Sequence, residues 1–324
     1  MSELIPVLLA LIILIGGVIV AAVLTWFERR LLGVWQDRYG PNRLGPLGIG
    51  QVLADMIKLL FKDDWVPPFA DKVVFIFAPT AIVVAMMMGF AVVPFAPGMM
   101  IIDVNIGLLF FLGMTSLAVY SVLLGGLASN NKYALLGGLR SAAQMVSYEV
   151  FMGLSLMGVV MMSGSFSLVA IVEAQTDLWF CFSQILGLIV FVIAGIAESH
   201  RLPFDLPEAE HELTAGFHTE YGGMKFAMFM LGEYLGLMLI SCMIVTLFFG
   251  GWHGPALIGH WLPPLFWFGF KVFIVICFFV LLRAAIPRPR YDQLMSLGWK
   301  VMLPITLINL VITGAVLLWM EGAG

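Results

Sequence analysis

Charged residues are scarce in this sequence. Only 11% of its 324 residues are Asp, Glu, Lys or Arg and 61% are hydrophobic, against about 25% and about 45 to 50% in soluble domains. So few charges leave most of the surface apolar, which excludes an ordinary soluble protein and favours one surrounded by lipid. We predict one all-α integral membrane domain over residues 1–324.

Patterns that bind metals and cofactors are also missing. Cys181, Cys242 and Cys277 lie in apolar stretches without a CxxC spacing, and the five histidines form no HExxH pattern. We therefore expect this chain to bind no metal, flavin or iron–sulfur cluster, and we identify no catalytic residue in it. No Gly-rich phosphate loop is present, so a nucleotide site within this chain has no support. We also expect no nucleic-acid partner.

Long apolar runs recur along the chain. A membrane-spanning helix needs about 20 mostly apolar residues to cross about 30 Å of hydrocarbon. Eight stretches qualify, and their approximate bounds are 4–27, 73–95, 104–128, 140–163, 178–197, 226–249, 261–286 and 299–320. The predicted fold is thus a polytopic bundle of about eight transmembrane helices.

A shorter helix is predicted in the first loop, over 49–62. Its polar residues Gln51, Asp55, Lys58 and Lys62 recur at steps of three and four, which places them in one stripe on an otherwise apolar surface. Fourteen residues rise only about 21 Å, too little to span a bilayer. We expect this amphipathic helix to lie flat in the membrane interface.

The basic residues fall on one side of the predicted membrane. Fifteen of the sixteen lysines and arginines lie in the first, third, fifth and seventh loops, and the other, Lys271, lies inside the seventh span. Lys and Arg accumulate on the cytoplasmic side of membrane proteins. The odd-numbered loops are therefore predicted to be cytoplasmic, with both termini periplasmic.

Three ionisable residues, Glu149, Glu233 and Lys271, lie inside predicted spans. Such residues are costly in a bilayer and usually mark a pathway, a binding site or an ion pair. Counted from the cytoplasmic ends of their spans, Glu149 and Glu233 lie about 14 Å and about 12 Å deep. For these two acids we favour a proton relay over simple packing between helices. Lys271 lies near the midplane, where pairing with an acid explains it as well as a functional role does.

The fifth loop, 198–225, is acidic although it lies on the basic side. It carries six acids, Glu198, Asp205, Glu208, Glu210, Glu212 and Glu220, against Arg201 and Lys225. A charge run is usually a solvated face. Pro203 and Pro207 stiffen this segment, however, and apolar residues interleave the acids. We hypothesise a packed cluster of carboxyl groups whose protonation is interdependent.

Four motifs resemble those of one family. They are ERRLLGVWQDRYGPNRLGPLGIGQVLADMIKLLFK at 28–62, SAAQMVSYEV at 141–150, RLPFDLPEAEHEL at 201–213 and RAAIPRPRYDQLMSLGWK at 283–300. In this order they resemble the membrane subunit designated H in bacterial proton-pumping NADH:quinone oxidoreductase (respiratory complex I), called subunit 1 in mitochondria. The resemblance implies a translocase subunit of the bacterial inner membrane, with quinone as the substrate.

The resemblance also implies site residues and partners. The head of a quinone tunnel would be formed by Glu28, Arg29, Arg38, Asp55, Lys58 and Arg283. A proton path toward the pumps would use Glu149, Glu198, Asp205, Glu208, Glu210, Glu212, Glu220 and Glu233. The implied partners are hydrophilic quinone-reducing subunits on the cytoplasmic side, small membrane subunits, antiporter-like pump subunits and lipid.

Other interpretations fit parts of the pattern. A related subunit of a membrane-bound hydrogenase would share the motifs without reducing quinone. A proton-coupled secondary transporter would use Glu149, Glu233 and Lys271 as its site. A structural scaffold would leave the buried acids unexplained, and interfacial anchoring to lipid headgroups is the simpler role for any single basic residue.

Overall fold

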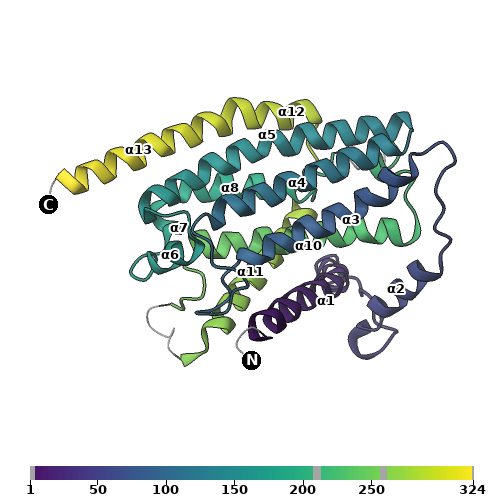
Figure 1. Ribbon diagram of the computed structural model, residues 1–324, viewed down its shortest axis with the longest axis horizontal. Coiled ribbons are helices and arrows are strands. Elements are labelled where there is room, and N and C mark those ends of the chain that lie inside the picture. Colours follow the sequence, from purple (N-terminus) through teal and green to yellow (C-terminus); the bar gives the residue numbers. More distant parts are fainter. Residues whose placement is uncertain (1–3, 207–212, 256–260, 323–324) are drawn as a thin grey trace.

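The computed structural model describes residues 4–206, 213–255 and 261–322, which form helices and no strand. Most of the helices run along the long axis of the molecule in one bundle (Figure 1). Their bounds are α1 Leu4–Trp35, α2 Gln51–Phe61, α3 Lys72–Gly89, α4 Gly107–Ala128, α5 Lys132–Ser163, α6 Leu168–Glu173, α7 Phe180–Ser183, α8 Ile185–Glu198, α10 Gly223–Phe248, α11 Pro264–Ala285, α12 Tyr291–Leu297 and α13 Leu303–Gly322.

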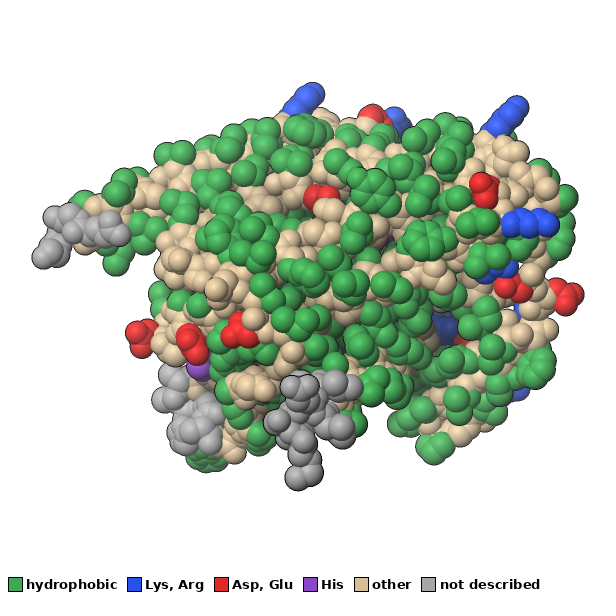
Figure 2. Space-filling view, in the orientation of Figure 1, with side chains coloured by type: hydrophobic (Ala, Val, Ile, Leu, Met, Phe, Trp, Pro, Cys, Tyr) green, Lys and Arg blue, Asp and Glu red, His purple; other side chains and the backbone are tan. Residues whose placement is uncertain are grey.

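The predicted membrane class is confirmed. Seven helices in the described ranges are long and apolar enough to cross a bilayer, and α8 is a shorter apolar helix. Figure 2 shows the matching surface, where hydrophobic side chains cover most of the visible face and lysines and arginines lie toward its right end and upper rim. The chain is therefore an all-α integral membrane protein.

The fifth predicted span differs from the structure, because 178–197 is not one continuous helix. Gln184 has φ −121° and ψ 43° and separates α7 from α8. Its buried amide donates to Thr313 Oγ1 at 2.8 Å and accepts from Asn309 Nδ2 at 2.8 Å. These side-chain partners on α13 hold the amide in place, so α8 begins after it and rises only about 21 Å.

Several helix ends also differ from the sequence prediction. The first and fourth spans are longer, because α1 continues to Trp35 and α5 begins at Lys132, where the Asn131 side chain caps it by accepting from the Tyr133 N–H. The last span begins at Tyr291 and contains a π-helical turn, Gly298–Met302. Hydropathy detects the apolar part of a helix, whereas capping groups decide where the helix ends.

Helix α10 lies at the centre of the bundle. It is the most buried of the seven long helices and packs against α1, α3, α8 and α11. Gly232 permits close packing, since a Cβ there would lie 2.8 Å from Ile82 Cγ2 on α3. Small residues of this kind let membrane helices approach each other closely. The ionisable residue next to it, Glu233, is thus carried into the interior.

Helix α2 has the amphipathic character that its stripe predicted. It contains no buried residue, and Leu53, Met56, Ile57 and Leu60 are exposed. It packs beside α1 and α10, at the lower right in Figure 1, and its eleven residues rise about 16 Å. A helix of this length and pattern lies along the interface and does not span the bilayer.

Candidate functional site

The segment after α1 folds back along the helix that precedes it. The Arg38 backbone N–H donates to the Gly33 carbonyl at 2.9 Å. A Cβ on Gly40 would lie 2.8 Å from the Cα of Arg30, and Gly48 has a φ of +78°. Glycine is the residue that tolerates both conditions. The Gly-rich connection thereby holds Arg38 against the polar end of α1.

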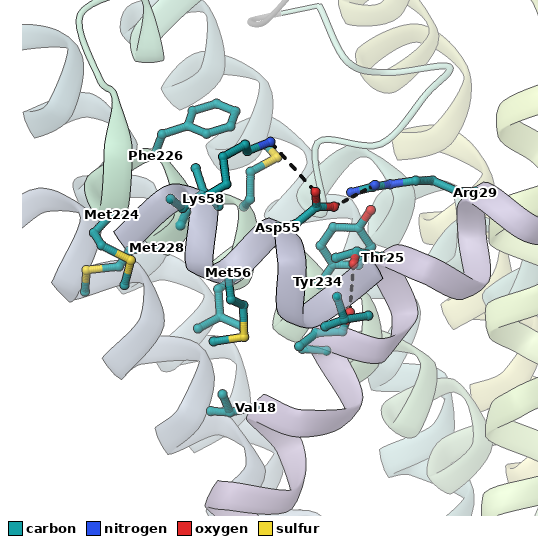
Figure 3. Close-up of a pocket in the computed structure, with 17 residues that line it drawn as sticks. Val18, Thr25, Arg29, Asp55, Met56, Lys58, Met224, Phe226, Met228 and Tyr234 are labelled. Carbon is teal, nitrogen blue, oxygen red and sulfur yellow. Dashed lines mark hydrogen bonds and ion pairs between the residues drawn. The ribbon is translucent and has the colours of Figure 1, made fainter. Parts of the chain in front are cut away.

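An apolar pocket of about 320 Å³ lies between α1, α2 and α10. Helix α1 contributes Val18, Ala21, Ala22, Thr25 and Arg29; α2 contributes Val52, Asp55, Met56, Lys58 and Leu59; α10 contributes Met224, Phe226, Ala227, Met228, Met230, Leu231 and Tyr234. In Figure 3, Arg29, Asp55 and Lys58 lie at one end of this pocket and Val18 at the other. The pocket is thus apolar along most of its length and charged at one end.

Asp55 connects α2 to α1. Its carboxylate lies 2.7 Å from Arg29 Nη1 and 3.8 Å from Lys58 Nζ, and it accepts from Gln51 Nε2 at 3.0 Å. Burial by itself would raise the pKa of Asp55, but the hydrogen bonds from Arg29 and Gln51 and the charges of Arg29 and Lys58 outweigh it and lower that pKa. Asp55 is therefore an ionised bridge between the two helices.

A polar pocket of about 640 Å³ adjoins the apolar one. Its lining consists of Glu28, Arg29, Leu32, Arg38, Tyr39, Gly40, Pro41, Tyr234 and Arg283. Arg29 and Tyr234 line both pockets, so the two are neighbours. The six residues predicted for a tunnel head, Glu28, Arg29, Arg38, Asp55, Lys58 and Arg283, all line one pocket or the other.

Glu28 accepts hydrogen bonds from three side chains at the polar pocket. Only 3% of it is exposed, yet it accepts from Arg201 Nη1 at 2.9 Å, from the Tyr234 hydroxyl at 2.9 Å and from Arg283 Nη1. The Arg201 guanidinium also lies 4.1 Å from the centroid of the Tyr234 ring. One buried carboxylate thus joins α1, α10, α11 and the start of the acidic loop.

Sequence reasoning missed Arg201 and Tyr234 as site residues. Burial alone would lower the pKa of Arg201, but the charges of Glu28, Tyr234 and Glu233 and a hydrogen bond with Tyr234 together outweigh burial and raise that pKa above its usual value. The available signal was that Arg201 opens the RLPFDLPE motif as a base in an acidic loop. Tyr234 directly follows Glu233 on α10, so the same helix supplies two neighbouring polar groups.

The acids carried by the helices α5, α8 and α10 form two groups. Glu233 is 7% exposed and lies near enough to Arg201 for electrostatic attraction. In the second group, the half-buried Glu149 accepts from Ser116 Oγ at 2.8 Å and lies within range of electrostatic repulsion from Glu198. Glu198 is 1% exposed, and its carboxyl oxygens have no hydrogen-bond donor among the described residues. Such a group is costly to keep charged.

The structure describes two of the remaining acids predicted for the loop and leaves three outside the described residues. Asp205 pairs with Arg288 Nη2 at 2.9 Å, and Glu220 accepts from Asn131 Nδ2 at 2.7 Å. Glu208, Glu210 and Glu212 lie outside the described residues. In the part of the loop that the structure describes, Phe204, Leu206 and Phe217 are buried. A fully solvated loop is excluded for this part.

Lys271 is held by backbone carbonyl groups. Its ammonium donates to the carbonyls of Phe249, Gly251 and His253 at 2.6, 3.1 and 2.5 Å and lies 4.3 Å from the centroid of the Trp179 ring. These carbonyls follow the C-terminal end of α10, where the helix dipole favours a cation. Glu233 lies sixteen residues before Phe249 on the chain, about 24 Å away along a helix. Pairing of Lys271 with Glu233 is excluded by this separation.

No group of three His, Cys, Asp or Glu residues that could bind a metal is found in the described part of the chain. The family model for NADH dehydrogenase matches residues 8–314. The NADH-quinone oxidoreductase subunit designated H in Methylococcus capsulatus (strain ATCC 33009 / NCIMB 11132 / Bath) is 65% identical over 304 residues, which cover 94% of this chain and 95% of that relative. The family match spans every residue that lines the two pockets. The chain therefore belongs to the NADH dehydrogenase family, whose members include this membrane subunit of NADH-quinone oxidoreductase.

Proposed function

We propose that this chain, as a subunit of a proton-translocating NADH-quinone oxidoreductase, binds quinone between α1, α2 and α10 and links its reduction to proton movement. Family membership supports the subunit role. The observation that carries the finer proposal is that an apolar pocket adjoins a polar pocket at Arg29 and Tyr234. Quinones of membranes have an apolar tail and a polar head, and these adjoining pockets suit the two parts.

In this proposal the quinone head lies in the polar pocket and its tail lies along α2. The N–H groups of Arg38 and Arg283 donate to the quinone oxygens and stabilise the negative charge that develops there on reduction. In this proposal the electrons come from hydrophilic partner subunits, because the family resemblance implies a chain without a redox centre of its own. On α2, the tail would lie against Val52, Met56 and Leu59, which line the apolar pocket.

Coupling would begin at Glu28. New negative charge beside Arg283 competes with Glu28 for the positive charge of the arginines. This competition changes how strongly Arg201 interacts with Glu28 and with Glu233. Arg201 opens the acidic loop, so this change reaches Asp205, Glu208, Glu210, Glu212 and Glu220 and draws protons from the loop. The path continues through Glu198 and Glu149 toward antiporter-like and small membrane subunits.

The asymmetry of basic residues supports an orientation for this arrangement. The loops that carry Lys and Arg would face the bacterial cytoplasm and the hydrophilic subunits, with both termini on the periplasmic side of the inner membrane. The secondary-transporter alternative loses its support, because Lys271 is held by the carbonyls that follow α10 and not beside Glu233.

A bulky side chain in the apolar pocket tests the quinone site. Met56→Trp narrows the pocket, whereas Leu53→Trp, also on α2, does not line it. In the assembled enzyme we expect Met56→Trp to raise KM for long-tailed quinone about tenfold, the effect of about 1.4 kcal/mol of lost binding. Leu53→Trp and NADH oxidation by a water-soluble acceptor should be unchanged. Equal KM values in both variants would place the quinone elsewhere.

A further inference from the structure

A third cavity, separate from the two pockets described above, lies between α8, α10, α11 and the start of α12. Its volume is about 870 Å³, and it shares no lining residue with the other two pockets. All of its lining side chains are apolar except Gln293. We call this cavity the α8–α11 groove. An apolar groove of this size on a membrane protein needs an apolar occupant.

The depth of the groove is close to that of one leaflet. Along α11 its lining runs from Ile274 to Ile286, which corresponds to a rise of about 18 Å. The whole hydrocarbon core is about 30 Å thick. At the end of the groove beside α12, Pro287 and Pro289 of the α11–α12 connection line it. A partner helix needs the full thickness, whereas an acyl chain needs only one leaflet.

The end of the groove beside α12 carries basic residues. The segment 286–300 contains Arg288, which pairs with Asp205, and also Arg290 and Lys300, against one acid of its own, Asp292. Arg290 is exposed, and its backbone N–H donates to Gln293 Oε1 at 3.1 Å, which fixes it beside the lining residue. Arginine next to the interface attracts and hydrogen-bonds lipid phosphate.

The groove also borders the acidic loop. Pro203 and Phe204 line it, and the Phe204 carbonyl accepts from Gln144 Nε2 at 2.9 Å. The following residue, Asp205, pairs with Arg288 at 2.9 Å. An occupant of the groove therefore packs against the loop segment that joins α8 to the rest of the acidic loop.

We propose that the α8–α11 groove binds an anionic phospholipid from the leaflet on the basic side, with one acyl chain in the groove and the phosphate beside Arg290. The occupant is thus a structural lipid that supports the Pro203–Asp205 segment. This site does not depend on where quinone binds, because the groove and the two pockets share no lining residue.

Photolabelling of the purified, assembled enzyme tests this site. The probes are phosphatidylglycerol and phosphatidylcholine that carry a diazirine on the acyl chain, and labelled peptides are mapped by mass spectrometry. Ile193→Trp fills the groove, and Leu186→Trp is the matched control because it is exposed on α8 outside the groove. Arg290→Gln removes the proposed phosphate contact, with exposed Lys132→Gln at the head of α5 as its control.

We expect phosphatidylglycerol to label α8 and α11 peptides of the groove several times more strongly than phosphatidylcholine. Ile193→Trp should reduce this labelling about tenfold and Leu186→Trp should not, while Arg290→Gln should bring phosphatidylglycerol down to the level of phosphatidylcholine. If Ile193→Trp fails to assemble, competition by unlabelled phosphatidylglycerol against phosphatidylcholine on the unchanged enzyme supplies the same comparison. Equal labelling by both lipids, or crosslinks from groove peptides to a partner subunit in place of lipid, would overturn the proposal.

Discussion

Arg201 and Glu28 are 173 positions apart in the sequence, yet they form an ion pair of 2.9 Å in which both side chains are buried. Burying two charges is costly, and the cost is offset only when further hydrogen bonds satisfy them. Tyr234 and Arg283 supply such bonds to Glu28. The pair is therefore part of a network in which the removal of one member affects the others.

A double-mutant cycle should detect this network. Glu28→Gln leaves Arg201 and Arg283 close together without their shared anion, and Arg201→Gln leaves Glu28 with one arginine. We expect each single variant to lower the thermal stability of the assembled enzyme. The double variant should lose less than the sum of the two, by about 0.5 to 3 kcal/mol.

The cycle is measured by thermal unfolding of the purified assembly, with Lys132→Gln as an exposed control that should have no effect. Strictly additive losses would show that Arg201 and Glu28 do not stabilise each other.

Glu233→Gln should reduce proton translocation. The variant keeps the size of the side chain but cannot release a proton, so any path through Glu233 is blocked. We expect fewer protons moved per NADH oxidised in proteoliposomes, because Glu233 is buried on α10 within electrostatic range of Arg201. Glu173→Gln, at the exposed end of α6, is the control. Unchanged stoichiometry in Glu233→Gln would remove this residue from the path.

Two buried histidines should make the acidic loop sensitive to acid. Burial lowers the pKa of His200 to about 4, with a further contribution from the charge of His218, and burial lowers the pKa of His218 to about 4. His200 Nε2 lies 2.5 Å from Ser141 Oγ. Above pH 6.5 both histidines are neutral in the folded and the opened loop, so neither affects stability.

Below pH 6.5 the opened loop binds protons that the folded loop does not, and stability falls until the pH reaches about 4. The slope is up to about 1.4 kcal/mol per pH unit for each proton. Hydrogen exchange of the described part of the loop between pH 7.5 and 5.5 measures it. His200→Gln should flatten the pH dependence, and an unaltered slope would assign the acid sensitivity to other groups.

Lys271→Met should destabilise the end of α10 without affecting pumping. The variant leaves the carbonyls of Phe249, Gly251 and His253 without their charged donor. Loss of hydrogen bonds from a charged group costs about 1.5 to 3 kcal/mol. We expect faster hydrogen exchange in residues 249–255 and a lower melting temperature, with unchanged protons per NADH. A normal melting temperature with reduced pumping would instead place Lys271 in the proton path.

Hydropathy and periodicity predicted much of the fold. The apolar runs located all the long helices, and the stripe of Gln51, Asp55 and Lys58 identified α2 as amphipathic. The break at Gln184 was missed, because the side chains that hold it, Asn309 and Thr313, lie on α13. Local pattern cannot detect a partner that is more than a hundred residues away.

The candidate site was predicted in part. Glu28, Arg29 and Arg283 were selected by resemblance to the family motifs, and the structure places them around one polar pocket. Tyr234 was not selected as a site residue, and the role of Lys271 was left open. Both depend on contacts with distant backbone or side-chain groups, namely Glu28 for Tyr234 and the carbonyls that follow α10 for Lys271.

The sequence by itself determined that this protein lies in a membrane, since apolar length and charge asymmetry act locally and need no partner. It also placed the acids of Glu149 and Glu233 inside helices. Only the tertiary structure decided which charges meet, that is, Glu28 with Arg201 and Lys271 with backbone carbonyls. The physical reason is that each pairing is set by how helices distant in the chain pack against one another, and that packing is a property of the whole bundle.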